Sequence, residues 1–132
     1  MEEAKNTVEL QPEGYVLVTL EGKQDYMTMD ELAKRCKRLA DQMKAEGKPV
    51  IGLVDFSRDG GFTTGTNKAV MHALEEISYD RLALFGKGGV LEEVTKAVVL
   101  ALGKAERTKV FKTRDEALAW LMMKDPVHGY EN

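Results

Sequence analysis

Residues 49–56 read Pro-Val-Ile-Gly-Leu-Val-Asp-Phe, and this nearly unbroken apolar run decides the fold. A strand with one solvated face alternates apolar and polar side chains, whereas a continuous apolar run is typical of a strand covered on both faces. Strands of that kind occur in parallel sheets, whose neighbouring strands are connected by helices. We therefore expect residues 49–56 to form the central strand of an α/β sheet.

The chain before this run is predicted to begin with a hairpin. Two short runs rich in β-prone residues, 7–10 and 15–20, are separated by a Pro-Glu-Gly turn signal at residues 12–14. Strands linked by so short a turn pair in antiparallel fashion. We therefore expect one antiparallel pair in an otherwise parallel sheet.

A helix is predicted between the hairpin and the central strand, because apolar residues recur there at the spacing of one helix face. They are Met29, Leu32, Ala33, Cys36, Leu39, Ala40 and Met43. Thr28 with Glu31 predicts a capping box at the helix start, and Gly47 and Pro49 predict its end. Basic side chains outside the apolar stripe are balanced by acidic ones, which favours an ion-paired solvated surface over a basic patch.

Strands and helices are expected to alternate after the central strand. The apolar pattern predicts helices over residues 64–77, 90–102 and 113–122, and strands over residues 81–85 and 108–111. The element order is then β-β-α-β-α-β-α-β-α. Strict alternation after the hairpin implies βαβ crossovers and a largely parallel, five-stranded mixed sheet of the α/β class.

Length and composition exclude several classes of protein. The chain has 132 residues, which suits one domain, here residues 1–123 followed by a tail at 124–132. A net charge of −3 argues against nucleic-acid binding, which needs a surplus of Lys and Arg. One cysteine and two histidines predict no disulfide framework and no metal site, and no motif implies a cofactor.

The sequence also predicts where in the cell the protein is located. The first residues lack the basic and apolar regions of a signal peptide. The longest apolar run, residues 97–102, is far shorter than the ~20 residues that span a bilayer. We therefore expect a cytoplasmic protein without an integral membrane segment.

The segment after the central strand, residues 55–66, is predicted to be a loop that carries the functional site. Ligands of open α/β sheets bind beyond the carboxyl ends of strands, and this loop runs into a helix start that favours an anion. The candidate residues are Asp55, Ser57, Arg58, Thr63, Thr64, Gly65 and Thr66. They suit an anionic or phosphorylated group, and helix capping is the alternative explanation of the threonines.

Two further features are candidates for function. Lys87, Gly88 and Gly89 form a glycine-rich start of the third helix, which lacks phosphate-loop spacing but leaves an anion contact open. Val99 and Leu100 lie off the apolar stripe of that helix. They predict either a subunit contact in a homodimer or a helix deeply covered by its neighbours.

Several stretches resemble the SpoIIAA-like family, small bacterial proteins related to STAS domains and more distantly to the CRAL-TRIO lipid-binding fold. The strand-loop-helix of residues 50–77 and the phrase VFKTRDEALAWL at residues 110–121 carry the resemblance. It implies a hairpin followed by βα units and a non-enzymatic role. STAS domains are phosphorylated by a partner kinase at an Asp-Ser-Ser-Gly segment, and Phe-Thr-Thr-Gly stands at the matching residues 62–65.

The sequence therefore predicts a non-catalytic regulatory module that binds a protein partner or a small amphipathic or anionic ligand. The first alternative is a small-molecule or lipid carrier of the CRAL-TRIO type. The second is a small enzyme that uses Asp55, Arg58 and Asp59 at the strand ends.

Overall fold

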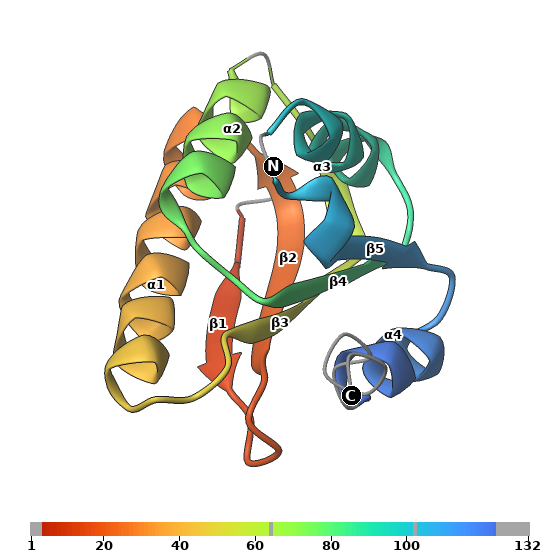
Figure 1. The fold of residues 1–132 in the computed structure, drawn as a ribbon. Coiled ribbons are helices and arrows are strands. Elements are labelled where there is room, and N and C mark those ends of the chain that lie inside the picture. Colours follow the sequence, from red (N-terminus) through yellow and green to blue (C-terminus); the bar gives the residue numbers. More distant parts are fainter. Residues whose placement is uncertain (1–3, 64, 102, 124–132) are drawn as a thin grey trace.

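The computed structural model describes residues 4–63, 65–101 and 103–123, and it has a five-stranded sheet with helices on both faces (Figure 1). The strands lie in the order β1-β2-β3-β4-β5; β1 and β2 are antiparallel, and every other neighbouring pair is parallel. This confirms the predicted mixed sheet.

The strands are β1 (Thr7–Leu10), β2 (Val16–Gln24), β3 (Ile51–Phe62), β4 (Arg81–Phe85) and β5 (Thr108–Phe111). The helices are α1 (Tyr26–Ala45), α2 (Thr66–Glu76), α3 (Gly89–Leu100), the 3-10 turn η1 (Ala105–Arg107) and α4 (Arg114–Leu121).

Two apolar cores lie on the two faces of the sheet. Helices α1, α2 and α3 cover one face and α4 covers the other (Figure 1). In β3, Phe56 is buried in the larger core and Leu53 in the smaller one. The central strand is thus covered on both sides, as its apolar run predicts. In the smaller core, Trp120 of α4 packs against Phe111 of β5 with ring centroids 5.6 Å apart.

Strand β2 shows which side chains point to which face. From Val16 to Gln24, every second residue is buried and the residues between them are more exposed. Val16, Val18 and Leu20 belong to the larger core, so this buried set faces α1, α2 and α3. The other set, which includes Glu21, faces the opposite side of the sheet.

Strand β3 is longer than the sequence predicts. It continues to Phe62, so most of the expected loop at residues 55–66 is strand. The reason is pairing with β2, in which Glu21 lies opposite Arg58 and Gln24 lies opposite Phe62. Two register shifts along this pair each accommodate one extra residue of β3, and the ladder satisfies backbone groups that a loop would leave to water.

The start of α1 also differs from the prediction. The helix begins at Tyr26, and its N-cap is Asp25. The Thr28 backbone N–H donates to Asp25 Oδ1 at 2.8 Å, and the Asp25 N–H donates to Thr28 Oγ1 at 2.9 Å. The capping box is therefore Asp25 with Thr28 rather than Thr28 with Glu31, because β2 runs to Gln24 and leaves Asp25 at the boundary.

Other boundaries shift by one or two residues. Helix α2 begins at Thr66 rather than residue 64, and α3 spans Gly89–Leu100, while the predicted end at residue 102 lies outside the described residues. The predicted cap of α4 is confirmed, since the Glu116 N–H donates to Thr113 Oγ1 at 3.2 Å. The expected tail, residues 124–132, also lies outside the described residues. No helix within the described ranges is both long and apolar enough to cross a bilayer.

Candidate functional site at the carboxyl ends of the strands

The starts of three helices gather at one edge of the sheet. Strands β2, β3 and β4 are parallel, and each is followed directly by a helix, namely α1, α2 and α3 (Figure 1). Both predicted loops lie at this edge, because parallel strands place all their carboxyl ends on the same side. The edge is therefore the candidate site, and its side chains decide what it can bind.

Asp59 joins the two predicted loops. Its Oδ1 accepts the Gly61 N–H at 2.7 Å, and its Oδ2 accepts the Val90 N–H at 3.2 Å, in the first turn of α3. A Cβ at Gly88 would lie 2.6 Å from Asp59 Oδ2, so the carboxylate sits directly against this helix start. The anion that the Lys87–Gly88–Gly89 segment would attract is supplied by the protein itself.

Removing this carboxylate is expected to destabilise the fold. Asp59→Ala leaves the Val90 and Gly61 N–H groups without their acceptor, and the loss of such a cap costs about 1–2 kcal/mol. Asp59→Asn keeps an acceptor oxygen but loses the charge, and it should lose less. Urea unfolding of both variants measures the difference. A change for Asp59→Ala within the range of about 0.5 kcal/mol typical of surface substitutions would contradict the capping role.

Arg58 does not reach the start of α2. Its Nη1 lies 3.3 Å from Glu21 Oε1, and Glu21 belongs to the side of β2 that faces away from α1, α2 and α3. Asp55 is engaged separately, since its Oδ1 accepts from the Ser57 N–H at 2.8 Å and from Ser57 Oγ at 2.6 Å. Asp55, Arg58 and Asp59 thus make separate contacts and form no shared acid–base pair.

The turn into α2 is held by backbone and buried hydroxyl contacts. The Thr63 N–H donates to the Gln24 carbonyl oxygen at 3.0 Å, and the Thr66 N–H donates to the Thr63 carbonyl oxygen at 3.3 Å. Thr66 is fully buried, and its Oγ1 donates to the same Gln24 oxygen at 3.4 Å. Gly65, the N-cap, has a φ of 103°, which favours glycine. Thr64 lies outside the described residues.

Two apolar side chains lie beside this turn and were not among the predicted site residues. Tyr26 and Met27, the first residues of α1, are 37% and 77% exposed. A Cβ at Gly65 would lie 3.8 Å from the Tyr26 Cβ, which places the start of α1 against the start of α2. The sequence signal for them is slight: an apolar pair just ahead of the core stripe that begins at Met29.

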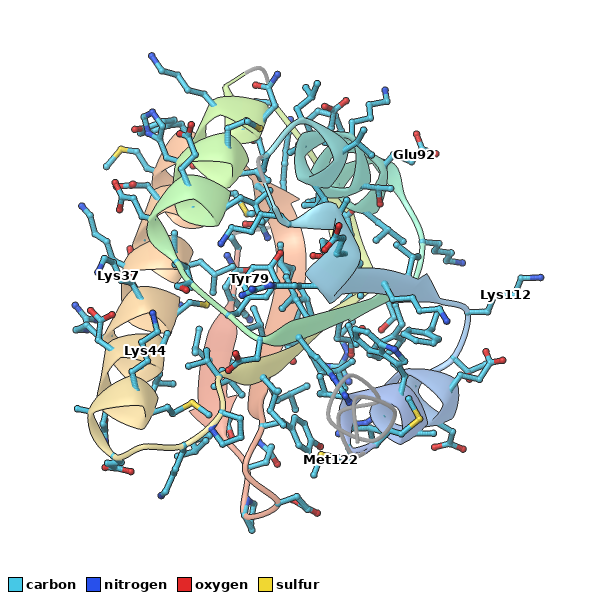
Figure 2. The ribbon with its side chains drawn as sticks, viewed as in Figure 1. Lys37, Lys44, Tyr79, Glu92, Lys112 and Met122 are labelled. Atoms are coloured by element: carbon cyan, nitrogen blue, oxygen red, sulfur yellow. The ribbon has the colours of Figure 1, made fainter. Side chains whose placement is uncertain are left out.

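Helix α1 carries ion pairs between neighbouring turns on its outer side. Lys34 pairs with Asp30 at 3.1 Å, and Lys37 pairs with Asp41 at 3.0 Å. Lys37 projects outward from α1 in Figure 2. These ion pairs one turn apart agree with the expected ion-paired face.

The remaining candidate residues lie away from the carboxyl ends of the strands or do not come together in a site. Val99 and Leu100, at the end of α3, are 72% and 76% exposed, so the neighbouring elements do not cover them. His72 is exposed on α2. Within residues 4–63, 65–101 and 103–123, no three His, Cys, Asp or Glu side chains are grouped so that they could hold a metal ion.

Cys36 lies on the side of α1 that faces the larger core, as predicted for a structural thiol. It is partly buried against the larger core, and burial raises the pKa of its thiol from 9.0 to about 11. The thiol is therefore neutral at physiological pH and a poor nucleophile.

The raised pKa of Cys36 predicts a loss of stability in alkali. In the unfolded chain the thiol ionises near pH 9, whereas in the folded protein it ionises near pH 11. Its contribution is present below pH 9 and is lost as the pH rises toward 11, by up to about 2–3 kcal/mol. Unfolding free energies of wild type and Cys36→Ala across this window isolate the effect. Parallel curves for the two proteins would show that the thiol ionises normally.

The SpoIIAA-like family profile matches residues 15–122. The chain belongs to the SpoIIAA-like family. No curated protein matches the sequence. The resemblance seen in the sequence is thereby confirmed, and the match spans every strand and helix of the structure except β1.

Solved structures share the fold at low sequence identity. An anti-sigma factor antagonist from Mycobacterium paratuberculosis is 17% identical with a TM-score of 0.62, over 92% of this chain and 96% of the other. A protein of SpoIIAA-like fold from Shewanella loihica is 18% identical with a TM-score of 0.58, over 89% and 93%. The Bacillus cell fate determinant SpoIIAA in its phosphorylated form is 14% identical with a TM-score of 0.57, over 88% and 98%.

Proposed function

We propose that this SpoIIAA-like protein is a non-catalytic regulatory module that binds a protein partner through the edge where α1 and α2 begin. The binding surface comprises Tyr26, Met27, Thr63 and residues 65–67. The observation that carries the proposal is the exposure of Met27, 77%, beside the glycine-capped start of α2. Similarity to an anti-sigma factor antagonist supports a protein as the ligand.

The surface has the composition of a small protein interface. Its centre is apolar, with Tyr26 and Met27, and exposed polar side chains, Asn67 and Lys68, lie at its margin. Aromatic and methionine side chains are enriched in the cores of such interfaces, and a polar rim surrounds them. The separated contacts of Asp55, Arg58 and Asp59 give the enzyme alternative no comparable support.

Phosphorylation at the same turn is the proposed control of partner binding. The Bacillus relative has been solved in phosphorylated and unphosphorylated forms. In this chain the buried hydroxyl of Thr66 is closed to a kinase, which leaves Thr63 and Thr64 as the candidates. A phosphate there would bring roughly two negative charges, which the start of the helix stabilises. The same charges would disrupt the binding of a partner to the apolar surface. The same helix start is the proposed site for a free anion.

Site-specific photo-crosslinking tests the proposal. A photo-reactive residue at position 27 should attach a specific protein in an extract of the source cells, and mass spectrometry then identifies it. The same residue at position 122 is the control, because Met122 is a 45% exposed methionine directly after α4, on the other face of the sheet (Figure 2). A protein attached equally at both positions would argue against the proposed surface.

We further propose that Val99 and Leu100 form a homodimer contact at the end of α3. Their exposure, 72% and 76%, is unusual for two adjacent apolar side chains. Val99→Glu would place an unpaired charge in that contact, whose desolvation is costly, and should convert a dimer into a monomer. Sedimentation velocity at several concentrations gives the answer. A wild-type protein that stays monomeric at the highest concentration would refute the dimer.

A further inference from the structure

Small side chains face one another between the sheet and two of its helices. Gly52 of β3 and Cys36 of α1 line the same space as four alanines of α1 and α2, which are Ala33, Ala40, Ala69 and Ala73. Helices α1 and α2 lie side by side over this part of the sheet (Figure 1). Because the larger side chains around them do not close the space, an apolar cavity of about 140 Å³ remains, which is partly open to solvent.

The cavity volume limits what can enter. An engineered apolar cavity of about 150 Å³ in another protein stays dry and binds benzene or xenon. Sites for drug-sized ligands are larger, about 300–1,000 Å³. A volume of about 140 Å³ therefore suits one aromatic ring or a short alkyl group and is too small for the lipid of a CRAL-TRIO-type carrier.

The lining selects for neutral ligands. It consists of apolar side chains with two exceptions, the Cys36 thiol and Tyr79. The Tyr79 hydroxyl is already hydrogen-bonded to Thr108 Oγ1 at 2.5 Å, and the thiol is a weak hydrogen-bonding group. A charged ligand would lose its hydration and gain no partner in return.

The lining residues that keep some exposure mark an entrance. On the helices these are Ala33 and Cys36 of α1 and Ala73 and Ile77 of α2, whereas Leu32 and most other helix residues of the lining are buried. Ala33 and Ala73, with small side chains, belong to this partly exposed part of the lining. A ligand would thus pass between α1 and α2.

From this geometry we propose that the cavity between β3, α1 and α2 binds a small neutral apolar molecule, of about the size of benzene. The cavity is separate from the partner surface of Tyr26 and Met27, so the proposal stands or falls independently of the proposed function. The occupant is identified by its chemistry: one uncharged ring or a short branched alkyl group, with no hydrogen-bonding group that needs a partner.

Benzene is the probe, with benzoate and dodecanoate as the charged and the long-chain comparison. At about ten times its dissociation constant, benzene should raise the Tm by about 3–6 °C. Methyl NMR signals of Leu32 and Leu74, which line the cavity, should shift, while that of Leu118 in the smaller core should not. Neither benzoate nor dodecanoate should have these effects. Stabilisation by dodecanoate would favour a lipid carrier and overturn the stated size limit.

Cavity-filling variants complete the test. Ala73→Leu should fill the space and weaken benzene binding at least tenfold, and Ala33→Leu does the same from α1 if the first variant folds poorly. Ala119→Leu, at an exposed position of α4, is the matched control and should bind benzene as the wild type does. The proposal would be overturned if benzene caused no methyl shifts in the wild type. It would also be overturned if benzene caused the same shifts in Ala73→Leu and Ala33→Leu as in the wild type.

Discussion

Replacing Gly86 with alanine is expected to lower the free energy of unfolding by about 3–5 kcal/mol. Gly86 follows β4 with a φ of 123°, a conformation that residues with a side chain rarely adopt. A Cβ there would lie 2.8 Å from both the Phe56 carbonyl carbon and the Ser57 nitrogen. These are backbone atoms of β3 directly after Asp55, which pairs with Thr19 of β2 and with Phe85 of β4, so moving them away would disturb both pairs.

Gly47→Ala is the matched control for Gly86→Ala. Gly47 also has a positive φ, 73°, but a Cβ there would meet nothing within 4 Å. Its substitution should cost only the left-handed conformation, about 1–2 kcal/mol. Chemical denaturation of the two variants therefore separates the clash from the conformational cost. Equal losses would mean that β3 and β4 are not as closely packed as described.

The sequence predicts the fold well because the decisive signals are local. The apolar run at residues 49–56 reports burial on both faces, and the structure shows Leu53 and Phe56 in opposite cores. The helical period of the stripe from Met29 to Met43 likewise needs no knowledge of distant residues. Errors are confined to boundaries, as at Asp25, where the length of the preceding strand decides which residue caps the helix.

The candidate site was only partly predictable, because its contacts join residues far apart in the chain. Asp59 caps Val90 across a separation of 31 residues, and the pairing of Arg58 with Glu21 spans 37. No local pattern specifies such contacts, so the two glycine-rich segments were expected as separate sites. The cavity was missed for a similar reason, since its volume depends on how the small side chains of three elements combine.

Replacing Met27 with aspartate is expected to weaken partner binding about 30-fold or more. Met27 is 77% exposed and lies at the centre of the proposed surface, where a carboxylate would have to be desolvated without a counter-charge. Truncation or disruption of a central interface residue typically costs about 2–4 kcal/mol, which is the source of the expected factor. The fold should be unaffected, because the side chain is outside both cores.

The dissociation constant of the cross-linked partner, measured by titration calorimetry against three proteins, tests the central claim most directly. The three are the wild type, Met27→Asp, and Met122→Asp, which makes the same change at an exposed methionine directly after α4. We predict that the wild type and Met122→Asp bind equally and that Met27→Asp binds about 30-fold or more weakly. Equal affinity of Met27→Asp and the wild type, with Met122→Asp weakened instead, would place the partner on the α4 side and contradict the account.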